Sequence, residues 1–218
     1  MLKAKRSRLI RWILFLILSF AGGWWLIYGP PLRVTTDTES IVPRNALELA
    51  KENYNHEVKR AAEAYDLPYE YLMALTVLEC SGKKPAGSRF EKVVYKRMNQ
   101  VKSGDRKKYE NVRKHHLEDA SDDAIKNLST SWGPFQLMGY KCIGMEVNVL
   151  DIRGEQAVLH GASWIKEEYG DLLTKGKYKD AFHYHNTGRK YPKVGPPKTH
   201  DPNYVSRGVD YIEYFKQF

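Results

Sequence analysis

The chain has 218 residues, of which 42% are hydrophobic and 12% aromatic, so its composition excludes an intrinsically disordered protein. Its formal net charge of +9 favours anionic partners such as nucleic acid, acidic lipid headgroups or acidic cell-wall polymers. The sequence contains no Walker loop, zinc-finger spacing or dinucleotide fingerprint, which excludes the classes of protein defined by these motifs. We expect neither a metal ion nor another cofactor.

The first 28 residues predict a membrane anchor. Residues 1–11 are strongly basic, and residues 12–28 carry no charge and approach the ~17–25 residues that span a bilayer. Trp12 at one end and Trp24, Trp25 and Tyr28 at the other suit the two membrane interfaces. The basic flank places the N-terminus in the cytoplasm and the rest of the chain beyond the inner membrane, in the periplasm or outside.

Two alternatives exist for this N-terminal segment. It could be a signal peptide cleaved after Ala21, although the apolar residues beyond that point favour an uncleaved span. It could also be a buried core helix. Residues 29–44 contain Pro, Gly, Thr and Ser without apolar periodicity, which predicts a linker before a domain covering residues 45–218.

Helical periodicity dominates residues 45–218 and predicts one all-α domain. Apolar residues recur at three- and four-residue steps from Asn45 to Tyr65. We expect Asp66 to be the N-cap of the next helix, with Pro68 in its first turn and Gly82 at its end.

The remaining elements follow in chain order. Residues 83–130 are dense in charge and predict a poorly ordered flank or a lobe over a groove. Residues 129–139 predict a loop that leads into a helix. Further helices are expected at residues 154–169, ending at Gly170, at residues 178–184, and at the amphipathic C-terminus. Signals for strands are sparse.

Glu79 follows a run of apolar residues and predicts a functional acid. It shares a helix face with Leu72 and Leu75, whereas Glu70 lies on the opposite, solvated face. Desolvation and the negative end of a helix dipole both favour the protonated form of a carboxyl group, as general-acid catalysis requires. The alternative is a frayed helix end with an exposed Glu.

Four short motifs, in order, resemble the catalytic domain of lytic transglycosylases and goose-type lysozymes. The motifs are Glu79 with Ser81, Gly133 to Gln136 as Gly-x-x-Gln, Asn186 to Gly188 as Asn-x-Gly, and Tyr204-Val205 opening the last helix. The resemblance covers roughly residues 54–218 and implies a lysozyme-like fold. Each motif is weak alone, but their shared order behind an export segment is fairly specific.

The segment after the expected catalytic helix also resembles the N-acetylmuramidase endolysin family. That family usually carries a Phe-Glu pair, here Phe90-Glu91, followed by Arg-His, where this chain has Lys92-Val93. A second departure concerns the Asn-x-Gly turn. The transglycosylases usually place Tyr before the Asn, whereas this chain has His185 there and Tyr184 one residue earlier.

The resemblance implies that the substrate is the β-1,4 bond between N-acetylmuramic acid and N-acetylglucosamine in peptidoglycan glycan strands. Glu79 would protonate the glycosidic oxygen. It would then act as base while the sugar's 6-hydroxyl closes an anhydro ring, as in a transglycosylase. In the alternative, a hydrolytic muramidase, water attacks with help from a second carboxylate. Candidates for that acid are Glu91 first, then Asp105, Asp119, Asp122 and Asp123.

The same resemblance assigns sugar binding to the other motif residues. They are Ser81, Ser131, Gln136, Asn186, Tyr204, and Tyr184 or His185. Helix capping is the alternative for Gln136, and core packing is the alternative for Tyr204.

The cysteines, the histidines and the positive charge each allow another interpretation of the chain. Cys80 and Cys142 permit one disulfide bond in an exported domain, the alternative being two buried thiols. Cys80 with His160 or His183 would suggest a thiol hydrolase, but neither His has a recognisable orienting partner in the sequence. His183 and His185 with the His115-His116 pair would suggest a metal site, but no third ligand lies at a useful spacing. The domain could also be a non-catalytic peptidoglycan-binding part of an envelope-spanning assembly. Because the anchor places the domain outside the cytoplasm, anionic wall polymers or lipid headgroups are simpler partners for the positive charge than nucleic acid.

Overall fold

The computed structural model describes residues 45–218 of the chain. The expected cytoplasmic segment, transmembrane helix and linker, residues 1–44, therefore lie outside the described residues. From residue 45 onward, no helix combines the length and the apolar character needed to cross a bilayer.

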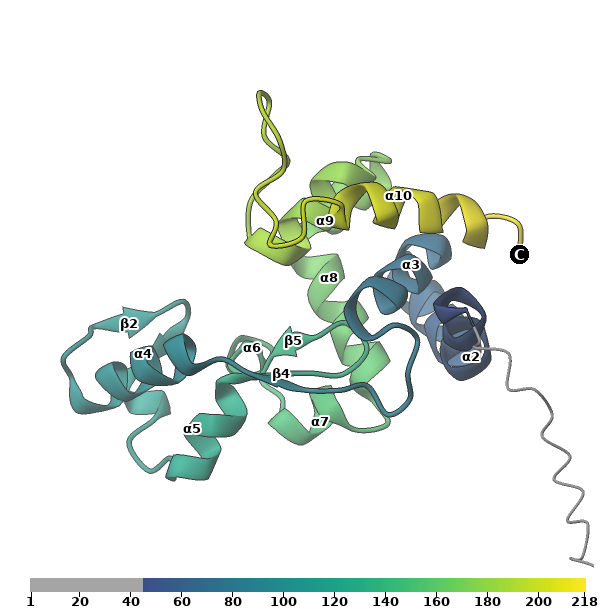
Figure 1. Ribbon diagram of the computed structural model, residues 1–218. Helices are drawn as coiled ribbons and strands as arrows, with labels where there is room; N and C mark the ends of the chain where they lie inside the picture. The colour runs from purple at the N-terminus through teal and green to yellow at the C-terminus, as the bar shows by residue number, and fades with distance from the viewer. Residues whose placement is uncertain (1–44) are drawn as a thin grey trace, which may run out of the picture. The chain divides into compact units, whose positions relative to one another are not determined.

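Helices predominate in the described residues, which confirms the expectation of a mostly helical domain (Figure 1). The longer helices are α2 (Ala46–Tyr65), α3 (Tyr69–Cys80), α4 (Lys92–Ser103), α8 (Ala157–Thr174), α9 (Tyr178–Thr187) and α10 (Tyr204–Phe215). The shorter ones are α5 (Asp122–Leu128), α6 (Lys141–Gly144), α7 (Val149–Arg153) and the 3-10 turn η1 (Lys114–His116).

Two small antiparallel sheets accompany the helices and were not expected from the sequence. The first has the order β1-β4-β5, with β1 (Arg89–Phe90), β4 (Thr130–Trp132) and β5 (Leu137–Met138). Ser131 in the central strand pairs with Arg89 on one side and Met138 on the other. The second is the hairpin of β2 (Lys108–Tyr109) and β3 (Val112–Arg113).

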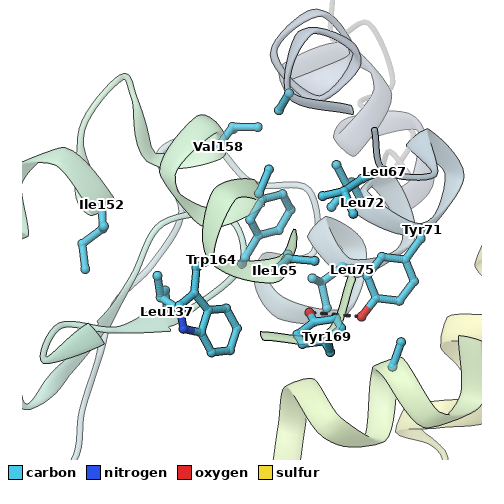
Figure 2. Packing of buried hydrophobic residues seen from close by; sticks show 14 of the residues in the cluster. Leu67, Tyr71, Leu72, Leu75, Leu137, Ile152, Val158, Trp164, Ile165 and Tyr169 are labelled. Atoms are coloured by element: carbon cyan, nitrogen blue, oxygen red, sulfur yellow. Dashed lines mark hydrogen bonds between the residues drawn. The ribbon is translucent and has the colours of Figure 1, made fainter. Parts of the chain in front are cut away.

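Helix α3 forms the centre of the hydrophobic core. Every residue from Tyr71 to Val77 is buried, so α3 is apolar on all sides, not along a single stripe. Figure 2 shows Tyr71, Leu72 and Leu75 beside Ile165 of α8, and a hydrogen bond joins the hydroxyls of Tyr71 and Tyr169 at 3.2 Å. Such complete burial is stable because α2 and α10 also pack along α3.

The junction between α2 and α3 corrects one expectation. Asp66 is the C-cap of α2, not the N-cap of α3, and adopts the left-handed conformation with φ 48°. Its N–H donates to the carbonyl of Ala62, and Leu67 N–H donates to the same oxygen at 3.0 Å. Short Asp side chains tolerate this conformation, which ends a helix much as Gly does. Pro68 takes the N-cap position of α3.

Residues 83–130 are ordered, so of the two alternatives the lobe is confirmed and the poorly ordered flank is wrong. They form a lobe of α4, the β2–β3 hairpin, η1 and α5, which lies apart from α2 and α3 in Figure 1. The lobe extends the same hydrophobic core, and its residues Met98, Val101, Val112, Leu117 and Ile125 are at most 1% exposed. A few well-spaced apolar residues suffice here because the charged residues between them point to solvent.

Three further boundaries differ from the sequence prediction. Residues 129–139 form the β4–β5 hairpin instead of a loop entering a helix. Helix α8 continues to Thr174 through a kink at Tyr169, whose φ of −151° is non-helical, so Gly170 does not end it. Helix α9 extends to Thr187, because Gly188 in the left-handed conformation caps it.

The packing of α10 against α9 predicts that Gly208→Val destabilises the fold. A Cβ at Gly208 would lie 2.7 Å from the ring of Phe182, which is fully buried and has no room to move. We expect the free energy of unfolding to fall by about 1–3 kcal/mol in urea titrations. Gly87→Val is the matched control, since a Cβ there meets nothing within 4 Å. Equal losses in the two variants would contradict this packing.

Candidate active site

Glu79 lies in the last turn of α3, and its side chain is 16% exposed. The next turn is pressed against α2, because a Cβ at Gly82 would overlap the backbone nitrogen of Ala50. Gly82 has a φ of +70°, and its carbonyl accepts a hydrogen bond from the Asn53 amide at 2.8 Å. The end of α3 is therefore fixed, and with it the backbone that carries the carboxyl group.

Tyr204, the first residue of α10, supplies a hydrogen bond to Glu79. Its ring is 5% exposed, and its hydroxyl donates to the Oε1 atom of Glu79. Burial, and then the negative charge of Glu79, raise the pKa of Tyr204 well above its ordinary value. The hydroxyl therefore keeps its proton at neutral pH and remains a donor. The structure thus brings together the two residues that the sequence motifs place far apart.

His185 lies next to the same carboxyl group at the end of a hydrogen-bonded chain. Its Nε2 is 2.9 Å from the carbonyl oxygen of Phe135 and 3.9 Å from Glu79 Oε1. A carbonyl only accepts, so Nε2 carries a proton. The Tyr169 hydroxyl, 2.7 Å away, can then donate to Nδ1 while accepting from the Tyr71 hydroxyl.

This chain of contacts changes the role expected for His185. The side chain is only 6% exposed, and both ring nitrogens have partners within the protein. Burial lowers the pKa of His185 despite the opposing charge of Glu79, which favours the neutral ring. His185 therefore braces the site from within, and its nitrogens are not free for a sugar.

A groove of about 790 Å³ adjoins this cluster. It lies between the β4–β5 turn, α6, α8 and the end of α9. Four of the residues predicted to bind substrate line it: Gln136, Tyr184, His185 and Asn186. Tyr140 and Trp164 add aromatic surface and Lys141 adds charge, so the groove offers both polar and aromatic contacts.

The amide of Gln136 is committed to the hairpin that carries it. Its Nε2 donates to the carbonyls of Gly87 at 2.7 Å and Gly133 at 3.0 Å, and its Oε1 accepts from the Ser131 hydroxyl at 2.8 Å. Gln136 has a φ of 48° and turns the hairpin, so it does not begin a helix. Ser131, which is buried, is its structural partner.

The other predicted sugar-binding residues are more open. Asn186 is exposed at the end of α9, and within residues 45–218 its amide has no hydrogen-bond partner. Tyr184 is half-buried and donates to Glu168 at 3.2 Å. Ser81 is exposed in the turn that follows Glu79. These three side chains, more than Gln136 or His185, are available to a ligand.

The candidates for a second acid all have local partners or lie on the lobe surface. Glu91, at the start of α4, forms an ion pair with Arg89 at 2.6 Å and is 31% exposed. The remaining candidates are exposed: Asp105 accepts from Ser103, Asp122 from Tyr95, Asp123 pairs with Lys126, and Asp119 lies on the surface.

The two cysteines are free, buried thiols, so of the two alternatives the disulfide bond is wrong and the pair of buried thiols is confirmed. Cys80 donates to the carbonyl of Thr76 at 3.2 Å, one turn earlier in α3. Burial raises the pKa of each thiol to about 11, which leaves both protonated at neutral pH. A protonated thiol is a poor nucleophile, and this argues against a thiol hydrolase.

Sequence reasoning missed the residues that brace the site from behind. Phe135, Tyr71 and Tyr169 come from the hairpin, α3 and the kink in α8. No local motif marks them, because each acts through a partner far away in the chain. The break in helical geometry at Tyr169 is the one feature that a periodicity analysis could have flagged.

Scans against protein-family models, curated protein sequences and solved structures each returned no match for this chain. The geometry of Glu79 and its neighbours is therefore the basis for assigning a function.

The buried His185 predicts a loss of stability in mild acid. Its folded pKa is lowered, so the unfolded chain binds more protons between that pKa and the ordinary value of about 6.5. The stabilisation is complete above that value and declines as the pH falls toward the folded pKa. We expect the urea midpoint to drop more for wild type than for His185→Gln between about pH 7.5 and about pH 5.5. The exposed His200, changed to Gln, should retain the wild-type slope. Parallel slopes for wild type and His185→Gln would contradict the prediction.

Proposed function

We propose that this chain cleaves the β-1,4 bond between N-acetylmuramic acid and N-acetylglucosamine in peptidoglycan, as a lytic transglycosylase with a lysozyme-like fold. The observation that carries the proposal is the setting of Glu79. A largely buried carboxyl group at the end of a core helix accepts a hydrogen bond from a protonated Tyr hydroxyl and lies 3.9 Å from His185, which lines the neighbouring groove of about 790 Å³.

The contacts of Glu79 suggest how it acts. Oε1 accepts from Tyr204, so Oε2 is the oxygen that would meet the glycosidic oxygen. Glu79 donates its proton as the glycosidic C–O bond breaks, and the charge left on the carboxylate is stabilised by Tyr204. The carboxylate then takes a proton from the sugar's 6-hydroxyl while that oxygen bonds to the anomeric carbon. The proton returns to Glu79, and an anhydro ring is formed.

The surroundings favour this single-acid route over hydrolysis. Glu79 is the acid whose charge acts on Tyr71, Tyr169, His185 and Tyr204. Glu91 is held by Arg89 instead. Hydrolysis usually requires a second carboxylate at a defined distance, whereas ring closure by the substrate's own hydroxyl does not. We further propose that residues 12–28 anchor the chain in the inner membrane with its catalytic domain beyond it, where peptidoglycan lies.

A Glu79→Gln variant tests the activity directly. Full-length chain in detergent is incubated with purified peptidoglycan, and the soluble products are identified by mass spectrometry. We expect anhydro-muropeptides from wild type and a rate lower by roughly 10²–10⁴-fold from the variant, because Gln cannot transfer a proton.

Other outcomes of that experiment would redirect the assignment. Reducing ends would indicate a muramidase. Binding without release by wild type would indicate a non-catalytic component of an envelope-spanning assembly. Equal release by Glu79→Gln would show that another group is the acid.

A Tyr204→Phe variant tests the role of the hydroxyl. The ring stays buried, but the donor to Glu79 is lost, and we expect kcat to fall roughly 10- to 100-fold with little change in KM. Tyr211→Phe, on the same helix, is the matched control and should retain the wild-type kcat. If both variants keep the wild-type kcat, the hydroxyl has no catalytic role.

A further inference from the structure

The segment 189–200, within the loop that joins α9 to α10 (residues 188–203), carries a concentration of positive charge, and Asp201, the first acidic residue after it, is paired with Arg207. It contains Arg189, Lys190, Lys193 and Lys198 and no acidic residue. All four side chains belong to exposed residues, and within the part of the chain that the structure describes none of them forms an ion pair. We call this segment the cationic loop.

A buried imidazole closes the base of the cationic loop. His183 is 2% exposed, and its Nδ1 is 2.7 Å from the carbonyl of Arg189. The N–H of Lys198 donates to its Nε2 at 3.0 Å. Because Nδ1 must donate to the carbonyl and Nε2 must accept, the neutral ring joins the two ends of the loop. The loop therefore projects from the end of α9 as a closed unit (Figure 1).

The cationic loop begins at the wall of the groove. Thr187, Gly188 and Arg189 line the groove, and Gly188, with a φ of 70°, turns the chain from α9 into the loop. The loop and the site are thus continuous along the backbone. A polymer held in the groove would carry its substituents past Arg189 toward the lysines.

We propose that the cationic loop binds the free carboxylates of the stem peptides on the strand held in the groove. This inference rests on the proposed function, because it assumes a peptidoglycan strand. The sugars of such a strand offer hydroxyl and N-acetyl groups, whereas its peptides carry free carboxylates. Arg189 can hold one carboxylate with two hydrogen bonds. The lysines act as point charges that attract other carboxylates of the stem peptides.

Unpaired charge and position favour this partner over a lipid surface. Arg189 lines the groove and meets whatever the groove holds, and the three lysines follow it along the loop. Several cations near one polymer also raise its local concentration through long-range attraction. The loop therefore selects strands that still carry peptides over bare glycan.

The test uses binding without turnover. Full-length Glu79→Gln in detergent is sedimented with purified peptidoglycan, before and after an amidase has removed the stem peptides. The loop variant adds Lys190→Gln, Lys193→Gln and Lys198→Gln. The matched control adds Lys175→Gln, Lys177→Gln and Lys179→Gln, three exposed lysines near the start of α9 with the same total charge.

We expect the parent and the control to bind peptide-bearing peptidoglycan roughly 5- to 10-fold more tightly than stripped glycan. The loop variant should lose most of that preference, because exposed charge pairs contribute little singly but act together here. Its binding should also depend less steeply on salt.

Several results would overturn the inference. One is that the parent binds both kinds of strand equally, or binds no peptidoglycan at all. Another is that the control variant also loses the preference for peptide-bearing strands, together with the loop variant. Binding of the same variants to vesicles of phosphatidylglycerol and phosphatidylcholine is measured in parallel. A loop variant that keeps the preference for peptide-bearing strands but no longer binds these vesicles would assign the loop to the membrane. Failure of the proposed activity is distinct, since it appears as missing anhydro products from wild type while the binding preference persists.

Discussion

A carboxyl group at the end of a fully buried helix requires a partner, and the Tyr204 hydroxyl supplies it for Glu79. This contact joins the end of α3 to the start of α10, two helices that also pack along each other. Together with burial, the charge of Glu79 raises the pKa of Tyr204, and His185 lies 3.9 Å from the same oxygen of the carboxyl group. The packing of α3 therefore has a chemical consequence, because it fixes Oε1 of the carboxyl group while Oε2 has no hydrogen-bond partner among residues 45–218.

Helix α9 contributes two histidines, two residues apart, one to the site around Glu79 and the other to the base of the cationic loop. His185 faces Glu79 and is held by Tyr169 and Phe135, while His183 faces the segment that follows the helix and is held by its backbone. A separation of two residues turns side chains about 200° around a helix, so the two rings point to opposite surfaces. The carbonyl of Phe135 accepts from the ring of His185, and the carbonyl of Arg189 accepts from the ring of His183, so each tautomer is fixed by a backbone carbonyl.

The sequence was a good guide wherever apolar periodicity was unambiguous. The helices α2 and α10 lie where the three- and four-residue steps predict them, and Glu79 emerges at the end of α3 as expected. The charge-dense lobe was underestimated, because its share of the core consists of only a few apolar residues separated by long polar stretches. The hairpin at Gln136 could not be predicted, since its strands are two or three residues long and depend on β1.

The site was predictable only in part, for a related reason. A motif marks a residue that acts by itself, such as Glu79, but not the residues that hold it. Gln136 and Ser131 matched a family pattern, yet in this fold they bond to each other and to the loop at Gly87. Tyr71 and Tyr169 match no pattern and become visible only as a chain of hydroxyls leading to His185.

Both ends of the cationic loop are hydrogen-bonded to the His183 ring, which bears on how this domain can change over evolutionary time. A segment whose two ends are tied to one ring can lengthen, shorten or change its charge without altering the distance between the helices on either side. Under the proposed function, substitutions there would alter what the neighbouring surface binds without moving the residues around Glu79. The two ties to His183 would then mark the boundary between the segment that sets selectivity and the site that carries out the chemistry.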